Sequence, residues 1–276
     1  MAENLTRKLI AAHLIDGEMT PGSEIALRID QILLHDTTGP LCALELEAMG
    51  LDDIKAPLAV AYTDHLLLEA DHRNADVKGP NHAEIPHFEP IPDEMEIPVL
   101  LTFDDHITTD AIMPAGIEGM SLWSNLPGMT EYAFHPVDDS YVQHARDTGD
   151  HAIVAGRNYG QGSSREQAAL APRALGLRVV VAGNIARIHA ENLVNFGVLP
   201  LTFTEPKDRQ KLKKVAKLRI NQLRSTLRDG PGELDIHCDD DQMVHVRHDL
   251  SSRQVDILFA GGSIPWKRHQ LDDGDS

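Results

Sequence analysis

The residues best suited to chemistry lie in a glycine-rich turn, YGQGSSREQAAL, at 159–170. Its two glycines allow backbone conformations that other residues avoid, and Ser163 or Ser164 stands where a helix N-cap is expected. A helix start presents unpaired N–H groups and a positive dipole end, and Arg165 adds a forked cation. This combination suits a carboxylate ligand, although an ordinary capped strand-to-helix turn accounts for the same pattern.

Two further groups could take part in the same chemistry. Asp110 follows two threonines in FDDHITTDAIMPAG, at a loop edge that we expect to lie near the glycine turn. Asp64 and His65 end a predicted strand and could form an acid/base pair, although adjacent strand residues point to opposite faces. A turn-stabilising aspartate and a plain polar strand end remain the alternative interpretations.

Composition narrows the classes of partner. The 276 residues carry a formal net charge of −18, which disfavours nucleic acid and anionic membranes as partners. No apolar run reaches the roughly 18 residues of a membrane span, and the N-terminus lacks the pattern of a signal peptide. We therefore expect a soluble cytoplasmic protein. Cys42 and Cys238 are too few for a cysteine-ligated cluster or zinc site, so no metal is predicted for this chain alone.

The periodicity of the N-terminal part predicts alternating helices and strands. Apolar residues at helical spacing predict a helix at 4–16, and a second helix at 41–50 ends at a glycine. Segments rich in β-branched residues predict strands at 24–36 and 58–67. A proline-rich stretch at 77–98 then predicts a linker between domains at 1–76 and 99–276.

In the C-terminal part, strands and helices alternate between residues 151 and 203, which predicts an α/β layer. The basic stretch at 205–229 is interpreted as a solvated helix, with an anionic partner as the alternative. The segments ELDIHC and QMVHVRHD predict strands, and SSRQVDILFAGG predicts a short helix with a glycine stop.

Three motifs, TTDAIMPAG, YGQGSSREQAALAPRALG and ARIHAENLVNFGVLPLTF, resemble in their order and spacing the C-terminal swivelling domain of the aconitase and isopropylmalate isomerase family. RHDLSSRQVDILFAGG resembles the closing segment of that domain, and the first 76 residues resemble the N-terminal start of bacterial aconitases. The resemblance implies an α/β protein with a three-layer β/β/α swivelling domain after a partial α/β/α N-terminal segment.

The family isomerises hydroxy acids such as citrate and isocitrate through cis-aconitate, and its hydro-lyases use a [4Fe–4S] cluster. The resemblance implies that Ser163 removes a proton as an alkoxide, which needs a nearby cation and oriented donors. The implied residues are Ser163, Asp110, Asp64 and His65 for catalysis, and Arg165, Ser164, Gly162 and His35 for binding of a tricarboxylate or dicarboxylate substrate.

The departures from the family pattern concern the cluster first. The chain passes from HRNAD directly to VKGPN, where family members carry the cluster cysteines, so the cluster is not expected on this chain alone. His35 stands where the family usually has glutamine, and Ala111 replaces the histidine of TTDH. Gln167 replaces the histidine of GSSREH, and Trp123 stands in place of a basic residue.

Two hypotheses follow from this pattern. The chain is either one part of a hydro-lyase, completed by a cluster-bearing protein similar to a large subunit, or an inactive remnant that binds small carboxylates or a protein partner. A role in RNA binding is disfavoured by the charge of −18. Because residues 1–76 would lose most of their packing partners, we expect them to dock loosely or to self-associate through an exposed apolar face.

Overall fold

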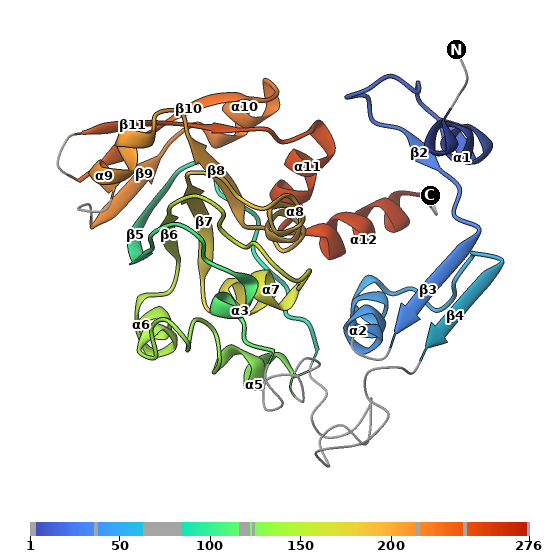
Figure 1. Ribbon diagram of the computed structural model, residues 1–276, viewed down its shortest axis with the longest axis horizontal. Coiled ribbons are helices and arrows are strands. Elements are labelled where there is room, and N and C mark those ends of the chain that lie inside the picture. The colour runs from blue at the N-terminus through green and yellow to red at the C-terminus, as the bar shows by residue number, and fades with distance from the viewer. Residues whose placement is uncertain are drawn as a thin grey trace.

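The C-terminal part of the protein is built on a closed barrel of seven strands. The computed structural model describes residues 4–35, 38–62, 84–115, 122, 125–212, 216–239 and 242–274. In their order around the barrel, the strands are β10 (Gly232–Cys238), β11 (Met243–His248), β8 (Leu199–Phe203), β7 (Leu177–Ala182), β6 (His151–Ala155), β5 (Met95–Thr102) and β9 (Lys217–Ile220). The predicted mixed α/β fold is therefore confirmed, with its strands closed into one barrel (Figure 1).

Neighbouring strands from β5 through β8 run parallel, and β9, β10 and β11 pair antiparallel. The central parallel strands are buried on both faces, which explains their continuous apolar sequence. Val154 of β6 packs into the barrel interior, whereas the adjacent Ile153 packs against the helices outside. Strands β10 and β11 alternate buried and exposed residues, because one face of each meets water.

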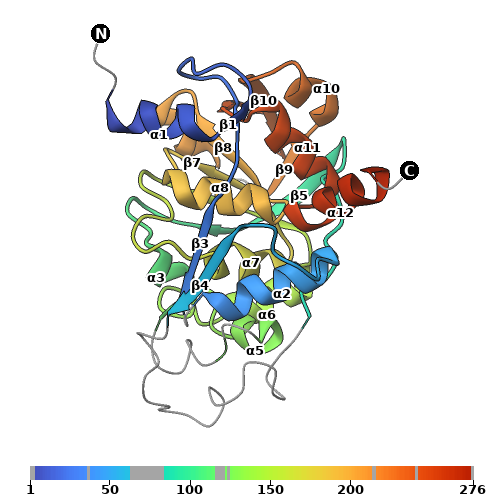
Figure 2. The same ribbon diagram turned by 90° about the vertical axis from the view of Figure 1, so that its right-hand side faces the viewer.

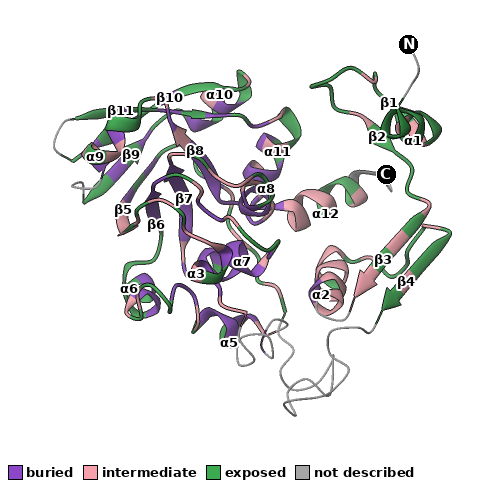
Figure 3. Cartoon of the chain, in the orientation of Figure 1, coloured by how far each residue is buried: buried purple, intermediate pink, exposed green. Residues whose placement is uncertain are grey.

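Helices cover the barrel on two sides (Figures 1 and 2). One group supplies the apolar cluster outside the parallel strands: α3 (Thr109–Ile112), α5 (Leu126–Thr130), α6 (Tyr141–Thr148) and α7 (Gln167–Ala174). Helix α8 (Arg187–Asn195) contributes to both apolar clusters, and α11 (Ser252–Ala260) to the barrel interior. Figure 3 shows that buried residues concentrate on the parallel strands and on the helix faces turned toward them.

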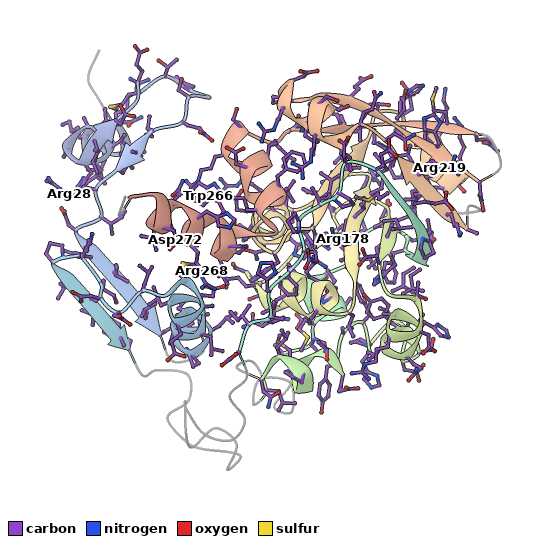
Figure 4. The ribbon with its side chains drawn as sticks, turned by 180° about the vertical axis from the view of Figure 1, so that it is seen from behind. Arg28, Arg178, Arg219, Trp266, Arg268 and Asp272 are labelled. Carbon is purple, nitrogen blue, oxygen red and sulfur yellow. The ribbon has the colours of Figure 1, made fainter. Side chains whose placement is uncertain are left out.

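The C-terminal helix signals behave as the sequence predicts. Ser251 and Gln254 form a capping box at the start of α11. Gly261 ends the helix in a left-handed conformation that favours glycine. A further helix, α12 (Ser263–Gly274), follows and was not predicted. Its Trp266 packs against the barrel cluster and under the guanidinium of Arg253, 5.0 Å from the ring centre (Figure 4).

The predicted helix at 205–229 is wrong. This stretch contains the short helices η2 (Pro206–Asp208), α9 (Arg209–Leu212) and α10 (Leu223–Arg228), with strand β9 between them. Leu218 and Ile220 alternate into the barrel, a period of two that the many basic residues conceal in the sequence. Arg219 points outward and pairs with Glu96 of the neighbouring strand β5 at 2.7 Å (Figure 4).

The N-terminal elements form a small unit beside the barrel (Figure 1). They are α1 (Leu5–His13), β1 (Leu14–Asp16), β2 (Ala26–Leu27), β3 (Gln31–His35), α2 (Gly39–Met49) and β4 (Leu58–Tyr62). The predicted strand at 24–36 is thus divided into β2 and β3, and β3 pairs in parallel with β4. Of the 12 large hydrophobic side chains exposed in the described part of the chain, nine lie at 5–62. The expectation of an exposed apolar face agrees with this distribution.

The described part of the predicted linker packs against the barrel. Ile91 is fully buried, and Arg178 of β7 donates hydrogen bonds to the carbonyl oxygens of Glu89 and Pro90, at 3.0 and 2.6 Å (Figure 4). Strand β5 already begins at Met95. The proposed division of the chain into domains remains a prediction. Among the described residues, no helix has the length and apolar character needed to cross a membrane.

Helix α2 is the N-terminal element that docks on the larger unit. Its Leu41 and Leu44 are buried in the apolar cluster outside the parallel strands. Beside them, Glu45 forms a hydrogen bond with Glu166, next to Arg165 of the glycine turn. Burial and then the charge of Glu166 raise the pKa of Glu45 to about 8. Burial also raises the pKa of Glu166. Glu45 therefore holds a proton near neutral pH and donates it to the Glu166 carboxylate.

This pair predicts a pH dependence of stability. Because the pKa of Glu45 is raised from 4.5 to about 8 on folding, its contribution is complete below pH 4.5 and is lost as the pH rises through 8. Glu45→Gln keeps a neutral donor. Above pH 8 we expect its free energy of unfolding to exceed that of the unmodified protein, by on the order of 2 kcal/mol. Urea unfolding at a series of pH values measures this, with exposed Glu18→Gln as the control. Parallel pH profiles for the unmodified protein and Glu45→Gln would refute the shared proton.

Candidate functional site

Three loops that follow β5, β6 and β7 meet at the carboxyl ends of these parallel strands. Backbone hydrogen bonds join them: the Gly160 amide donates to the Ile107 carbonyl at 2.7 Å, and the Tyr159 amide to the Asn184 carbonyl at 3.1 Å. The glycine turn thus lies as a short extension of the sheet between its two neighbours. Loops at this edge of a parallel sheet are the usual place for a ligand in α/β proteins.

The conformation of the turn depends on a close approach at Gly160. Its φ of +73° is in the left-handed region, and a Cβ there would lie 2.1 Å from Cδ2 of His189. His189 and Tyr159 form the floor beneath the turn, with ring centroids 5.3 Å apart and both side chains almost fully buried. Burial lowers the pKa of His189 to about 4, so this imidazole is neutral at physiological pH.

Arg165 and Asp110 connect the turn to the loop that follows β5. Nη1 of Arg165 donates to Oδ1 of Asp110 at 2.6 Å and to the carbonyl oxygen of Met113 at 3.1 Å. The Arg165 side chain is 9% exposed, whereas that of Asp110 is 65% exposed. Asp110 therefore lies beside the glycine turn, as the sequence predicts. Nε of Arg165 has no hydrogen-bond partner among the described residues.

The two serines do not cap a helix, which corrects the prediction. Helix α7 begins at Gln167, and its N-cap residue is Glu166, without a side-chain cap. Gly162, at φ +112°, directs the chain away from helical geometry, and the Thr109 hydroxyl donates to the carbonyl oxygen of Ser163 at 2.9 Å. Ser163 and Ser164 are consequently exposed in the loop before the helix.

A cavity of about 220 Å³ lies between the glycine turn and the first turn of α8. Its lining includes predicted site residues from the turn together with residues of α8. From the loops, these are Thr109, Gly160, Gly162, Ser163, Ser164 and Arg165; from the α8 side, they are Ala186, Arg187, Ile188, His189 and Asn192. No acidic side chain is among these lining residues, although the whole chain has a net charge of −18. The cavity therefore presents cations and hydrogen-bond donors.

Other predicted site residues do not join this group. His35 lies at the end of β3, where its Nε2 is 3.5 Å from the Thr38 hydroxyl, and it does not line the cavity. Asp64 and His65 lie outside the described residues, as does Trp123. The roles assigned to these residues remain predictions.

Thr109 and three residues of α8 line the cavity but were not predicted from the sequence: Arg187, His189 and Asn192. The motif ARIHAENLVNFG contained a usable signal, because His189 and Asn192 stand three residues apart and face the interior, where unpaired polar groups are unusual. Periodicity alone identifies a helix here but does not indicate which loop it faces.

The cysteines do not fit an iron–sulfur cluster held by this chain alone. Such clusters need about three or four cysteine ligands in general, and the chain has two. Cys42 lies on α2, and Cys238 is buried at the end of β10. No group of three or more histidine, cysteine, aspartate or glutamate residues in the described part of the chain is placed to hold a metal ion.

The part of the barrel unit that carries the glycine turn is similar to a known protein family. Residues 117–206 match the model of the aconitase C-terminal domain. This segment of the chain is therefore similar to the aconitase family. A putative mitochondrial aconitate hydratase of Emericella nidulans is 32% identical over 205 residues, which are 64% of this chain and 26% of that protein. Homocitrate dehydratase of Saccharomyces cerevisiae is 31% identical over 199 residues, 62% of this chain and 25% of that protein.

The chain thus spans about a quarter of the length of these two relatives. Aconitate hydratase A of Escherichia coli is 38% identical over 100 residues, 36% of this chain and 11% of that protein. A crystal structure of 3-isopropylmalate dehydratase from Methanocaldococcus jannaschii superposes with a TM-score of 0.50 at 22% identity. The match covers 66% of this chain and 99% of that chain, which shows that the two share a fold.

The floor of the glycine turn gives a stability prediction. Gly160→Ala adds a Cβ into the His189 ring and forces alanine to a φ of +73°. We expect a loss of unfolding free energy on the order of 3 kcal/mol, of which the backbone term is about 1. Gly230→Ala is the matched control, because Gly230 also has a positive φ but has open space around it. Denaturant unfolding that gives equal losses for both variants would contradict the role of the close approach.

Proposed function

We propose that this chain supplies the carboxylate-binding site and the catalytic base of an aconitase-type hydro-lyase, acting on small hydroxy tricarboxylates or dicarboxylates. One observation carries the proposal. In the glycine turn, Nη1 of Arg165 is engaged by Asp110 and Met113, whereas Nε has no partner among the described residues. The edge formed by Nε and the second terminal nitrogen therefore matches the fork that a carboxylate accepts.

In this proposal, Asp110 orients the guanidinium. An arginine held on one side by a carboxylate and a carbonyl loses little conformational freedom when it binds a ligand on the other side. The low exposure of Arg165 keeps this interaction away from bulk water, which strengthens it. The neighbouring hydroxyls of Ser163 and Ser164 are exposed at the same turn and complete the binding surface.

Ser163 is assigned the proton-transfer step. Its oxygen removes the proton from the carbon next to a substrate carboxylate, the electron pair of that C–H bond forms the double bond, and the hydroxyl group leaves from the adjacent carbon as water. The proton for that leaving hydroxyl is assigned to Asp64 and His65. Arg165 and the donors of the turn lower the cost of the serine alkoxide, because they place positive charge near it.

A partner chain completes the enzyme in this proposal. Aconitase-type enzymes usually use a [4Fe–4S] cluster, and the two cysteines here do not fit one. We therefore assign the cluster to a second protein, similar to a large subunit. The alternative function is that of a small-carboxylate receptor without turnover. With two cysteines and no partner protein, the chain would be such a receptor. The receptor would bind the carboxylate through the same residue, Arg165.

The catalytic role predicts a specific loss of activity. The chain is mixed with candidate cluster-bearing proteins after anaerobic cluster reconstitution, and cis-aconitate formation from citrate is followed by its ultraviolet absorbance. We expect Ser163→Ala to lower the rate by roughly 10²–10⁴-fold, because the base is lost. Ser23→Ala serves as the control and should retain the rate, because Ser23 is an exposed serine in the N-terminal unit, remote in sequence from the glycine turn.

Two results would overturn the proposal. Full activity of Ser163→Ala would remove the serine from catalysis, and citrate turnover by this chain alone would remove the need for a partner. If no partner yields turnover but citrate binds, the receptor function replaces the enzymatic one.

A further inference from the structure

The first turn of α8 faces the glycine turn across the cavity of about 220 Å³. Helix α8 has nine residues, and its N-cap, Ala186, provides no side-chain hydrogen bond to the first turn. The amide groups of a first helical turn lack partners within the helix. They carry the positive end of the helix dipole, which attracts anions.

A second and independent observation concerns the buried polar side chains at this cavity. Asn192 is 6% exposed and His189 is 2% exposed, and both line it. Nδ2 of Asn192 and both ring nitrogens of His189 lack hydrogen-bond partners among the described residues. Nε of Arg165, on the opposite wall, is also buried without a hydrogen-bond partner among the described residues. Buried polar atoms without partners are rare in folded proteins and indicate a missing polar ligand or water.

The chemistry of this wall selects the class of ligand. The Asn192 Nδ2 and Arg165 Nε atoms are donors only, and Arg187 adds an exposed cation that forms no ion pair with a residue the structure describes. No carboxylate from the described part of the chain is among the residues that line the cavity. A bound group must therefore accept hydrogen bonds and carry negative charge.

We propose that the first turn of α8, through Arg187 and Asn192, forms a second carboxylate subsite opposite Arg165. The chain would then hold two carboxylates of one small di- or tricarboxylate without help from a partner. The inference rests on the proposed function, since it assigns Arg165 to the first carboxylate. His189 is a positioning residue, because it packs beneath Gly160 and fixes the distance between the two walls. Aliphatic monocarboxylates engage only one wall and bind more weakly.

Calorimetric titration of the full chain with tricarballylate tests this subsite. The probe has three carboxylates and no hydroxyl group to eliminate, so binding is measured without turnover. Arg187→Gln is expected to raise Kd about tenfold, the effect of one charge-assisted hydrogen bond. Arg7→Gln is the matched control. It removes one exposed positive charge from the first turn of another nine-residue helix, and Kd should change less than about twofold. Butyrate, with one carboxylate, should lose little affinity in Arg187→Gln.

The possible outcomes separate this inference from the proposed function. If tricarballylate binds, and Arg165→Gln abolishes binding while Arg187→Gln leaves Kd unchanged, the α8 subsite is wrong and the carboxylate site at the glycine turn stands. Equal weakening by Arg187→Gln and Arg7→Gln would also refute the subsite, because the effect would then be one of net charge. Absence of binding to the unmodified chain would overturn both the subsite and the carboxylate site. If Arg187→Gln weakens binding but Ser163→Ala retains full turnover, the subsite stands and the catalytic assignment falls.

Discussion

The ion pair between Arg165 and Asp110 is the interaction on which the site depends. It joins the loops after β5 and β6 at 2.6 Å, and it can form because these strands are parallel neighbours whose carboxyl ends lie side by side. The barrel imposes that arrangement, because β5 pairs with β6, and β6 pairs with β7. The glycine turn then continues the sheet by backbone hydrogen bonds, and Gly160 provides the space that the His189 ring occupies. The position of the guanidinium thus follows from sheet topology as much as from the turn itself.

The charge at the cavity is positive, although the whole chain is strongly negative. The net charge of −18 repels anions at long range. Among the residues that the structure describes, two arginines and no acidic side chain line the cavity. The Arg165 side chain is only 9% exposed, so its charge acts strongly at short distance. On the other side of the turn, Glu45 forms a hydrogen bond with Glu166. Because Glu45 is protonated, it adds no second negative charge beside Arg165. This contact links the N-terminal unit to the site.

The sequence predicted the features with local causes. The order of β6, glycine turn and α7, and the glycine stop after α11, follow from short-range chemistry. The proximity of Asp110 to the turn was also predicted, but it depends on the pairing of β5 with β6. The strand β9 was missed because its buried residues, Leu218 and Ile220, are separated by a basic side chain. The first turn of α8 was not recognised as part of the site, because the two segments meet only through the parallel pairing of β6 and β7. Closure of the barrel likewise depends on long-range pairing that no local pattern records.

The central claim is that residues of this chain alone form a carboxylate site at the glycine turn. A crystal structure of the isolated chain with tricarballylate tests it most directly. The account predicts a carboxylate within hydrogen-bond distance of the Nε edge of Arg165, with the contact between Arg165 and Asp110 retained. A ligand bound elsewhere, or a carboxylate that replaces Asp110 on Nη1 and leaves Nε without a partner, would contradict the account.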